Sequence, residues 1–177
     1  EKVNKESSIR KAIDYQEERF EGGLYSEEEI KDVINYATKL HITIIPEIET
    51  PGHAMALLHA HPEFGCVGGE YEIPTTGGIF KDVLCVGNDE VIEYFKKVFA
   101  DVARIFPGKY IHIGGDECPH ERYETCPKCQ KRMEENNLKS AAELQSWMTV
   151  QIAKIVTSLG KIPVGWDEVL DNTQTFG

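Results

Sequence analysis

The sequence predicts an α/β fold with a parallel sheet and helical crossovers, and two observations support this prediction. Segments with helical and strand-like patterns alternate along the 177 residues, an order that is typical of parallel sheets. The segments 42–49, 110–117 and 161–168 also share one pattern, in which an apolar run is followed by Pro or Gly and then by acidic residues. Short apolar runs bounded by Gly or Pro are typical of buried strands.

Three longer segments have the pattern of amphipathic helices. Residues 26–40 and 140–160 each begin with a Ser-x-x-Glu capping box and then repeat apolar residues at helical spacing. Residues 88–106 begin at an Asn that can cap a helix and stop before a Pro-Gly pair. The predicted order is therefore helix then strand, three times over.

The acidic residues come at the carboxyl ends of the predicted strands. In parallel sheets, closed or open, these ends lie at one edge, where binding and catalytic residues gather. Residues 59–87 are rich in Gly and Pro, and residues 118–139 also have the composition of a loop. Long loops inside compact domains are usually functional or mobile. We therefore expect three acidic strand ends beside two long loops.

Composition excludes several classes of function. The net charge is −11 and Lys and Arg form no cluster, so a nucleic-acid partner is not expected. No run of apolar residues is long enough to cross a membrane, and no secretory signal is visible at the first residues. The length suits one domain rather than two.

The adjacent acids Asp116 and Glu117 follow two glycines in "HIGGDE". If both lay on a strand, their side chains would point to opposite sides. The residues alone leave two interpretations open. The acids cap a following helix or order a loop, or they contact two different parts of one ligand that the glycines allow to approach closely.

Three motifs in order resemble the family 20 glycoside hydrolases, the β-N-acetylhexosaminidases. They are "IPEIETPGH", "HIGGDE" and "GWDE", and the resemblance runs from about Gly23 to Leu170. It implies a partial (β/α)8 TIM barrel of about three to four βα units. Because a whole barrel takes about 250 residues, residues 1–177 are expected to form a single segment of the catalytic domain that is incomplete at both ends.

The resemblance also implies an activity and its residues. Family members remove terminal non-reducing β-linked N-acetylglucosamine or N-acetylgalactosamine with retention, and the substrate's acetamido oxygen attacks to give an oxazolinium intermediate. Glu117 matches the general acid/base, Asp116 the residue that holds the acetamido group, and His53 a histidine that tunes the acid. Glu49 stands where the family often has Asp. No cofactor is implied.

Aromatic residues near the motifs match the family's sugar pocket. By resemblance, Trp166 and Trp147 supply apolar walls for the sugar, although helical spacing alone favours core packing for Trp147. His112 is expected in the core or behind the site. Asp167 and Glu168 are expected to be structural caps rather than a second catalytic pair.

The five cysteines leave two interpretations open. One is a structural zinc site with three cysteine ligands and one histidine, formed by Cys118, His120, Cys126 and Cys129. The other is free or partly bridged cysteines, because a single CxxC motif is a moderate signal. Cys66 and Cys85 flank the long loop, and a disulfide between them would suit an oxidising compartment.

Two other functions remain as alternatives. The letters GGDE also occur in nucleotide cyclases, although there the motif lies on a hairpin and continues with Phe. The second alternative is that the chain is a non-catalytic barrel fragment or a sugar-binding module. The family's sugar-gripping Arg, the acid that partners the histidine and a later Tyr/Asp pair have no counterpart here, so the isolated segment is expected to be weakly active or inactive.

The expected partner is a glycan or glycoconjugate that ends in N-acetylhexosamine, with no nucleic acid and no membrane. Open strand edges predict self-association of the isolated segment. By resemblance, the complete parent would function in a periplasmic, secreted or lysosomal-type compartment.

Overall fold

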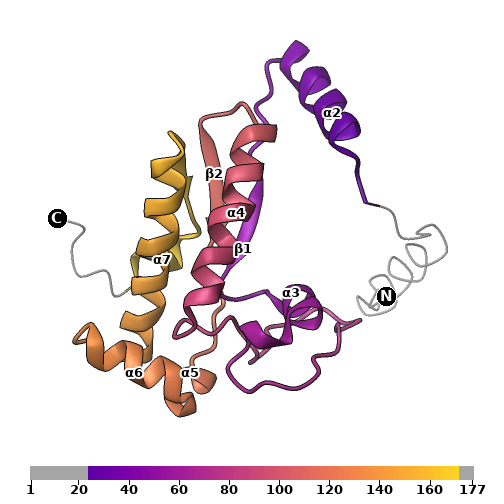
Figure 1. Cartoon of the computed structure of the whole chain (residues 1–177). Coiled ribbons are helices and arrows are strands. Elements are labelled where there is room, and N and C mark those ends of the chain that lie inside the picture. Colours follow the sequence, from indigo (N-terminus) through magenta and orange to yellow (C-terminus); the bar gives the residue numbers. More distant parts are fainter. Residues whose placement is uncertain (1–23, 172–177) are drawn as a thin grey trace, which may run out of the picture.

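The computed structural model describes residues 24–171 and contains a three-stranded parallel sheet (Figure 1). The strands are β1 (Glu47–Thr50), β2 (Tyr110–Gly114) and β3 (Ile162–Val164), in the spatial order β1-β2-β3. Both pairs of neighbours are parallel, and helices lie in each connection between them. The predicted α/β fold with parallel strands and helical crossovers is confirmed.

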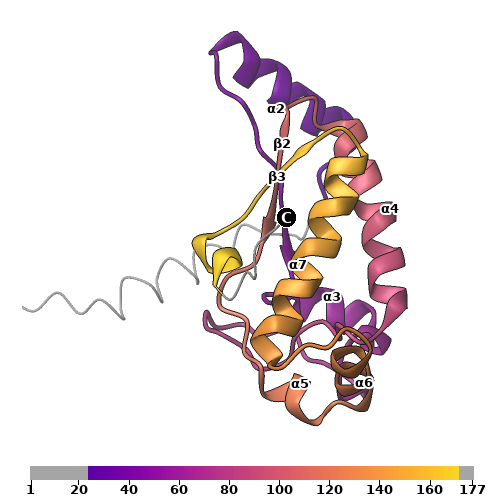
Figure 2. The ribbon, with the colours of Figure 1, turned by 90° about the vertical axis from the view of Figure 1, so that its left-hand side faces the viewer.

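Two long helices, α4 (Asp89–Ile105) and α7 (Ala141–Ser158), lie side by side on one face of the sheet, as Figures 1 and 2 show. The core forms between them and the strands. Ile111 and Ile113 of β2 are buried there, with apolar residues of both helices such as Phe99. The alternate residues of β2 face the other way, and no helix of the described part covers that second face (Figure 2).

The predicted caps define the helix starts. Asn88 accepts a hydrogen bond from the backbone N–H of Glu90 at the start of α4, and Ser140 accepts one from Glu143 at the start of α7. The carboxylate of Glu143 accepts a bond from the N–H of Lys139 rather than from Ser140. The second capping box is therefore shifted by one residue.

Helix α2 (Glu27–Lys39) begins with the predicted capping box but buries less than its pattern suggests. Only Ile34 and Ala37 are buried, whereas Val33 and Leu40 are about half exposed. The helix stands apart from the sheet and packs against α4 (Figure 1). Part of its apolar face is therefore exposed within residues 24–171.

The strands are shorter than the apolar patterns indicate. β1 begins at Glu47, so the run 42–45 precedes it, and Ile42 and Ile45 are about half exposed. β2 ends at Gly114 and β3 at Val164, before their acids. The acids of the second and third motifs thus lie in the turns after β2 and β3, whereas Glu47 and Glu49 lie on β1 itself.

Short helices that the sequence patterns did not predict lie in or next to the predicted loops 59–87 and 118–139. They are α3 (Met55–Ala60), the 3-10 helix η1 (Pro62–Phe64), α5 (Glu121–Thr125) and α6 (Pro127–Glu135). α6 has a Pro at its first position, where the missing N–H costs nothing, followed by good helix formers. Within the part described, no helix has the length and apolar character needed to cross a membrane.

Candidate active site

The carboxyl ends of the three strands are held together by hydrogen bonds between them. The hydroxyl of Thr50, the last residue of β1, donates to the carbonyl of Ile113 at 2.9 Å. The N–H of Trp166, just after β3, donates to the carbonyl of Gly114 at 3.0 Å. These contacts bring the segments "ETPGH", "GGDE" and "GWDE" to one edge of the sheet.

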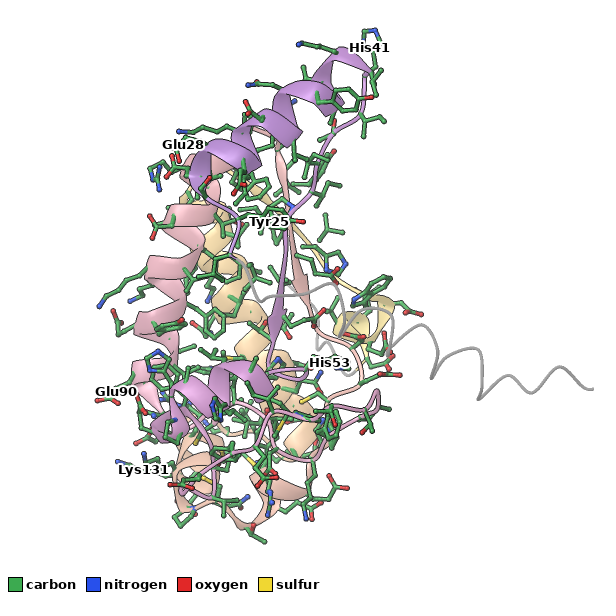
Figure 3. All side chains as sticks on the ribbon, turned by 90° about the vertical axis from the view of Figure 1, so that its right-hand side faces the viewer. Tyr25, Glu28, His41, His53, Glu90 and Lys131 are labelled. Carbon is green, nitrogen blue, oxygen red and sulfur yellow. The ribbon has the colours of Figure 1, made fainter. Side chains whose placement is uncertain are left out.

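His53 lies between two carboxylates at this edge. Its Nε2 atom is 3.5 Å from Oδ2 of Asp116 and 3.4 Å from Oε2 of Glu117. His53 follows the end of β1 (Figure 3), and the acids follow the end of β2. The structure therefore brings the three predicted catalytic residues together, with Glu117 the most exposed at 48% and Asp116 at 22%.

The turn after β2 explains how both acids reach one side. Gly114 and Gly115 have φ of +71° and +103°, and Glu117 has φ of +44°. A Cβ atom at Gly114 would overlap Glu49, and one at Gly115 would overlap Val169. Because the acids lie in this turn and not on the strand, the alternation of side chains expected for a strand does not apply to them.

Glu49, on β1, has a raised pKa. Burial, followed by the neighbouring carboxyls of Glu47 and Asp116, raises the pKa of Glu49 to about 7. Oε2 of Glu49 and Oδ1 of Asp116 are buried and have no hydrogen-bond donor within the described residues. A proton held on Glu49 supplies an O–H donor among carboxylates that otherwise only accept.

The face without helices carries a second polar group beside the acids. Oε1 of Glu47 accepts a hydrogen bond from Nε1 of Trp166 at 2.9 Å and lies 3.0 Å from Nδ1 of His112. The rings of His112 and Trp166 meet edge to face, with centroids 4.9 Å apart. Glu47 thus fixes both rings, while 47% of Trp166 stays exposed beside the strand ends.

The structure places Trp147 away from this group. Its Nε1 atom donates to Asn136 after α6, and Arg132 of α6 lies over its ring at 4.8 Å. Gln145, two residues earlier and so about 200° around the helix, instead donates from Nε2 to the carbonyl of Gly115 at 2.9 Å. Trp147 therefore packs against α6, as its helical spacing suggests, and does not lie beside Trp166 and the acids.

Other predicted residues have structural positions. Asp167 and Glu168 lie in the first turn of the 3-10 helix η2 (Asp167–Leu170), whose N-cap position is Trp166 and which has no side-chain cap hydrogen bond. Sequence reasoning did not select Glu47 or Gln145. Glu47 precedes a predicted strand end within "PEIE", whereas nothing in the sequence around Gln145 distinguishes it from other polar helix residues.

The predicted zinc ligand set of three cysteines and one histidine is not brought together. Sγ of Cys118 lies beside the hydroxyl of Tyr123 at 3.6 Å, and His120 bonds to Gln145 at 2.7 Å. Cys126 and Cys129 instead lie next to Cys66 and Cys85. All five cysteines are free thiols, so the Cys66–Cys85 disulfide is not formed.

Comparison with known proteins identifies relatives of one kind. The family model described as "Glycosyl hydrolase family 20, catalytic domain" matches residues 2–176. A beta-hexosaminidase of Porphyromonas gingivalis is 46% identical over 149 residues, which are 84% of this chain and 19% of the relative. A beta-hexosaminidase of Akkermansia muciniphila is 34% identical, over 82% of this chain and 30% of the relative.

Solved structures give the same result. The chitobiase of Flavobacterium johnsoniae superposes with a TM-score of 0.80 at 38% identity, over 84% of this chain and 23% of that one. The β-N-acetylhexosaminidase of Bacteroides fragilis superposes with a TM-score of 0.75 at 37% identity, over 84% and 28%. The chain spans between about a fifth and a third of the length of these relatives.

Proposed function

This chain belongs to glycosyl hydrolase family 20, and on that premise we propose that its strand ends carry the acid–base centre of a β-N-acetylhexosaminidase. The reaction is removal of a terminal, non-reducing, β-linked N-acetylhexosamine from a glycan or glycoconjugate. The observation that carries the proposal is the position of His53 Nε2, within 3.5 Å of both Asp116 and Glu117. One histidine beside two carboxyls can orient both.

The two acids have different tasks. Glu117, the more exposed, gives its proton to the leaving oxygen as the bond from that oxygen to the anomeric carbon breaks. The acetamido oxygen of the substrate forms the new bond to that carbon and becomes part of an oxazolinium ring. Asp116 accepts the acetamido N–H and balances the positive charge that develops there. Glu117 then removes a proton from the water that opens the ring.

Surrounding residues hold this geometry. The unpartnered Oδ1 of Asp116 is an acceptor in need of a donor, which suits an amide N–H. Gln145 holds the turn through the carbonyl of Gly115. The half-exposed ring of Trp166, fixed by Glu47, offers an apolar wall to the sugar.

A series of substrates tests the attack by the acetamido oxygen. We expect the hydrolysis rate of the complete protein to fall steeply as the acetamido methyl carries one, two and then three fluorine atoms, because each weakens the nucleophilic oxygen. Asp116→Asn should lower the rate for the unsubstituted substrate by about 10²-fold or more. A rate that does not depend on fluorination would show that a protein carboxylate, and not the substrate, is the nucleophile.

The nucleotide-cyclase interpretation does not fit this family. Its GGDE motif needs a hairpin, whereas β2 here is the central strand of a parallel sheet.

A further inference from the structure

Four cysteines that the proposed activity does not use meet where the loop after η1 lies against the start of α6. Cys66 lies in that loop, Cys85 precedes α4, and Cys126 and Cys129 lie at the start of α6. Cys85, Cys126 and Cys129 are buried and Cys66 is partly buried. All four Sγ atoms lie within 4.8 Å of one another, and we call them the four-cysteine cluster.

The spacing of the sulfur atoms distinguishes a metal site from disulfides. The Sγ atoms are 3.7 Å apart in three pairs, which are Cys66 with Cys129, Cys85 with Cys126, and Cys85 with Cys129. A tetrahedron with zinc–sulfur bonds of about 2.3 Å has edges of about 3.8 Å. A disulfide would need about 2.05 Å. The cluster therefore has the size of a zinc site with four thiolate ligands before any metal enters.

The surrounding backbone also suits thiolate ligands. The N–H of Gly87 donates to the sulfur atoms of both Cys85 and Cys129. A Cβ atom at Gly87 would overlap the backbone of Lys128 and Cys129, so the turn after Cys85 fits closely against the start of α6. Hydrogen bonds of this kind orient metal ligands and spread their negative charge.

Two helix N-termini begin next to the ligands. α6 begins after Cys126, which is its N-cap, and α4 begins four residues after Cys85. The N-terminal end of a helix carries partial positive charge, which offsets the net negative charge that four thiolates and one divalent ion would have. All four ligands come from the protein, so the site has no open position for a substrate and is of the structural kind.

We propose that Cys66, Cys85, Cys126 and Cys129 bind one Zn²⁺ ion in a closed tetrahedral site. Binding releases the thiol protons to solvent and forms four sulfur–zinc bonds, with no change of oxidation state. The ion joins the loop after β1 to the helices after β2. The N–H of Leu84, next to Cys85, donates to the carbonyl of Pro51 at 3.0 Å, so the cluster is connected to the turn that carries His53.

Metal analysis of the full chain, purified under reducing conditions without added metal, tests the proposal. We expect about one zinc per chain, released in proportion when a mercurial reagent titrates the thiols. Replacement of zinc by Co²⁺ should give thiolate-to-cobalt charge-transfer bands and the visible bands of tetrahedral coordination. The proposal would be overturned by any of three results under these conditions. They are well-folded protein without metal, bound iron in place of zinc, and a mass lowered by disulfide formation.

Variants locate the site. Cys85→Ser should lose the zinc, whereas the matched control Cys118→Ser, which changes the one cysteine outside the cluster, should keep it. If Cys85→Ser does not fold, the cobalt spectrum of the unmutated chain decides the coordination. Glu117→Gln should keep the zinc, so failure of the proposed catalytic role would not be mistaken for failure of the metal site.

Discussion

At the scale of single residues, the carboxyl groups of the site differ by their surroundings. Glu49 lies on the strand among other acids, and burial raises its pKa to about 7. Asp116 and Glu117 lie one and two residues after Gly115 in the turn, where His53 is close to both. A proton held on Glu49 makes it a hydrogen-bond donor among the neighbouring carboxyls, whereas the proposed donor to the substrate is Glu117.

Glu49→Gln tests the proton assigned to Glu49. Its pKa is raised from 4.5 to about 7, so between these values the folded chain holds a proton that the unfolded chain has lost. The free energy of unfolding should therefore fall as the pH rises from about 4.5 to about 7. Gln cannot ionise, so urea unfolding of the variant at several pH values should show a smaller fall.

The control for this experiment is Glu28→Gln, which removes an exposed carboxyl on α2. The free energy of unfolding of Glu28→Gln should depend on pH in the same way as that of the wild type. Equal slopes for wild type and Glu49→Gln would mean that Glu49 is ionised throughout.

At the scale of elements, helix starts could be predicted and strand ends could not. The capping residues Ser26, Asn88 and Ser140 act as expected because caps depend on neighbours in the sequence. The strand limits depend on pairing with other strands, so β1 excludes most of its apolar run. α5 and α6 were overlooked because their polar residues give no apolar period, although Pro127 was a usable start signal.

The site could be predicted only where motifs are continuous. Three short motifs predicted the family and the candidate residues Asp116, Glu117 and His53. The family prediction is confirmed. The four-cysteine cluster could not be found by spacing, because Cys66 and Cys85 come from a loop far from the CxxC pair in sequence. The position of Trp147 was decided by packing against α6, which no motif records.

The turn after β2 gives a prediction at this scale. Gly115→Ala should destabilise the fold by more than Gly160→Ala, because both positions have positive φ but only Gly115 would also push Cβ into a side chain, that of Val169. The backbone conformation alone costs about 1–2 kcal/mol. Equal changes in the free energy of unfolding, measured by denaturant titration, would show that Val169 moves aside without cost.

At the scale of the whole molecule, one face of the sheet has no cover within the described residues. Tyr110, Ile162 and Val164 lie there and are at least a third exposed, and Ile45 is exposed beside β1. Parallel sheets are normally covered on both faces. The relatives are three to five times longer than the matched part, which is consistent with further chain covering this face in them.

This exposed face predicts the behaviour of the 177 residues alone. We expect concentration-dependent association in light scattering after size exclusion, and at least about 10²-fold slower hydrolysis than by the complete protein, because an open site cannot exclude water or orient the sugar. Ile162→Lys should reduce the association without restoring activity. A monodisperse segment with full activity would contradict the account.

The most direct measurement of the central claim compares leaving groups in the Glu117→Gln variant of the complete protein. If Glu117 donates the proton, N-acetylglucosaminides with poor leaving groups should lose about 10²–10⁴-fold in kcat/KM, while those with strongly acidic phenols should lose far less in the ring-forming step. The predicted result is that kcat/KM of Glu117→Gln depends more steeply on the pKa of the leaving group than kcat/KM of the wild type does. An equal loss for all leaving groups, or no loss, would contradict the role of Glu117 as the general acid.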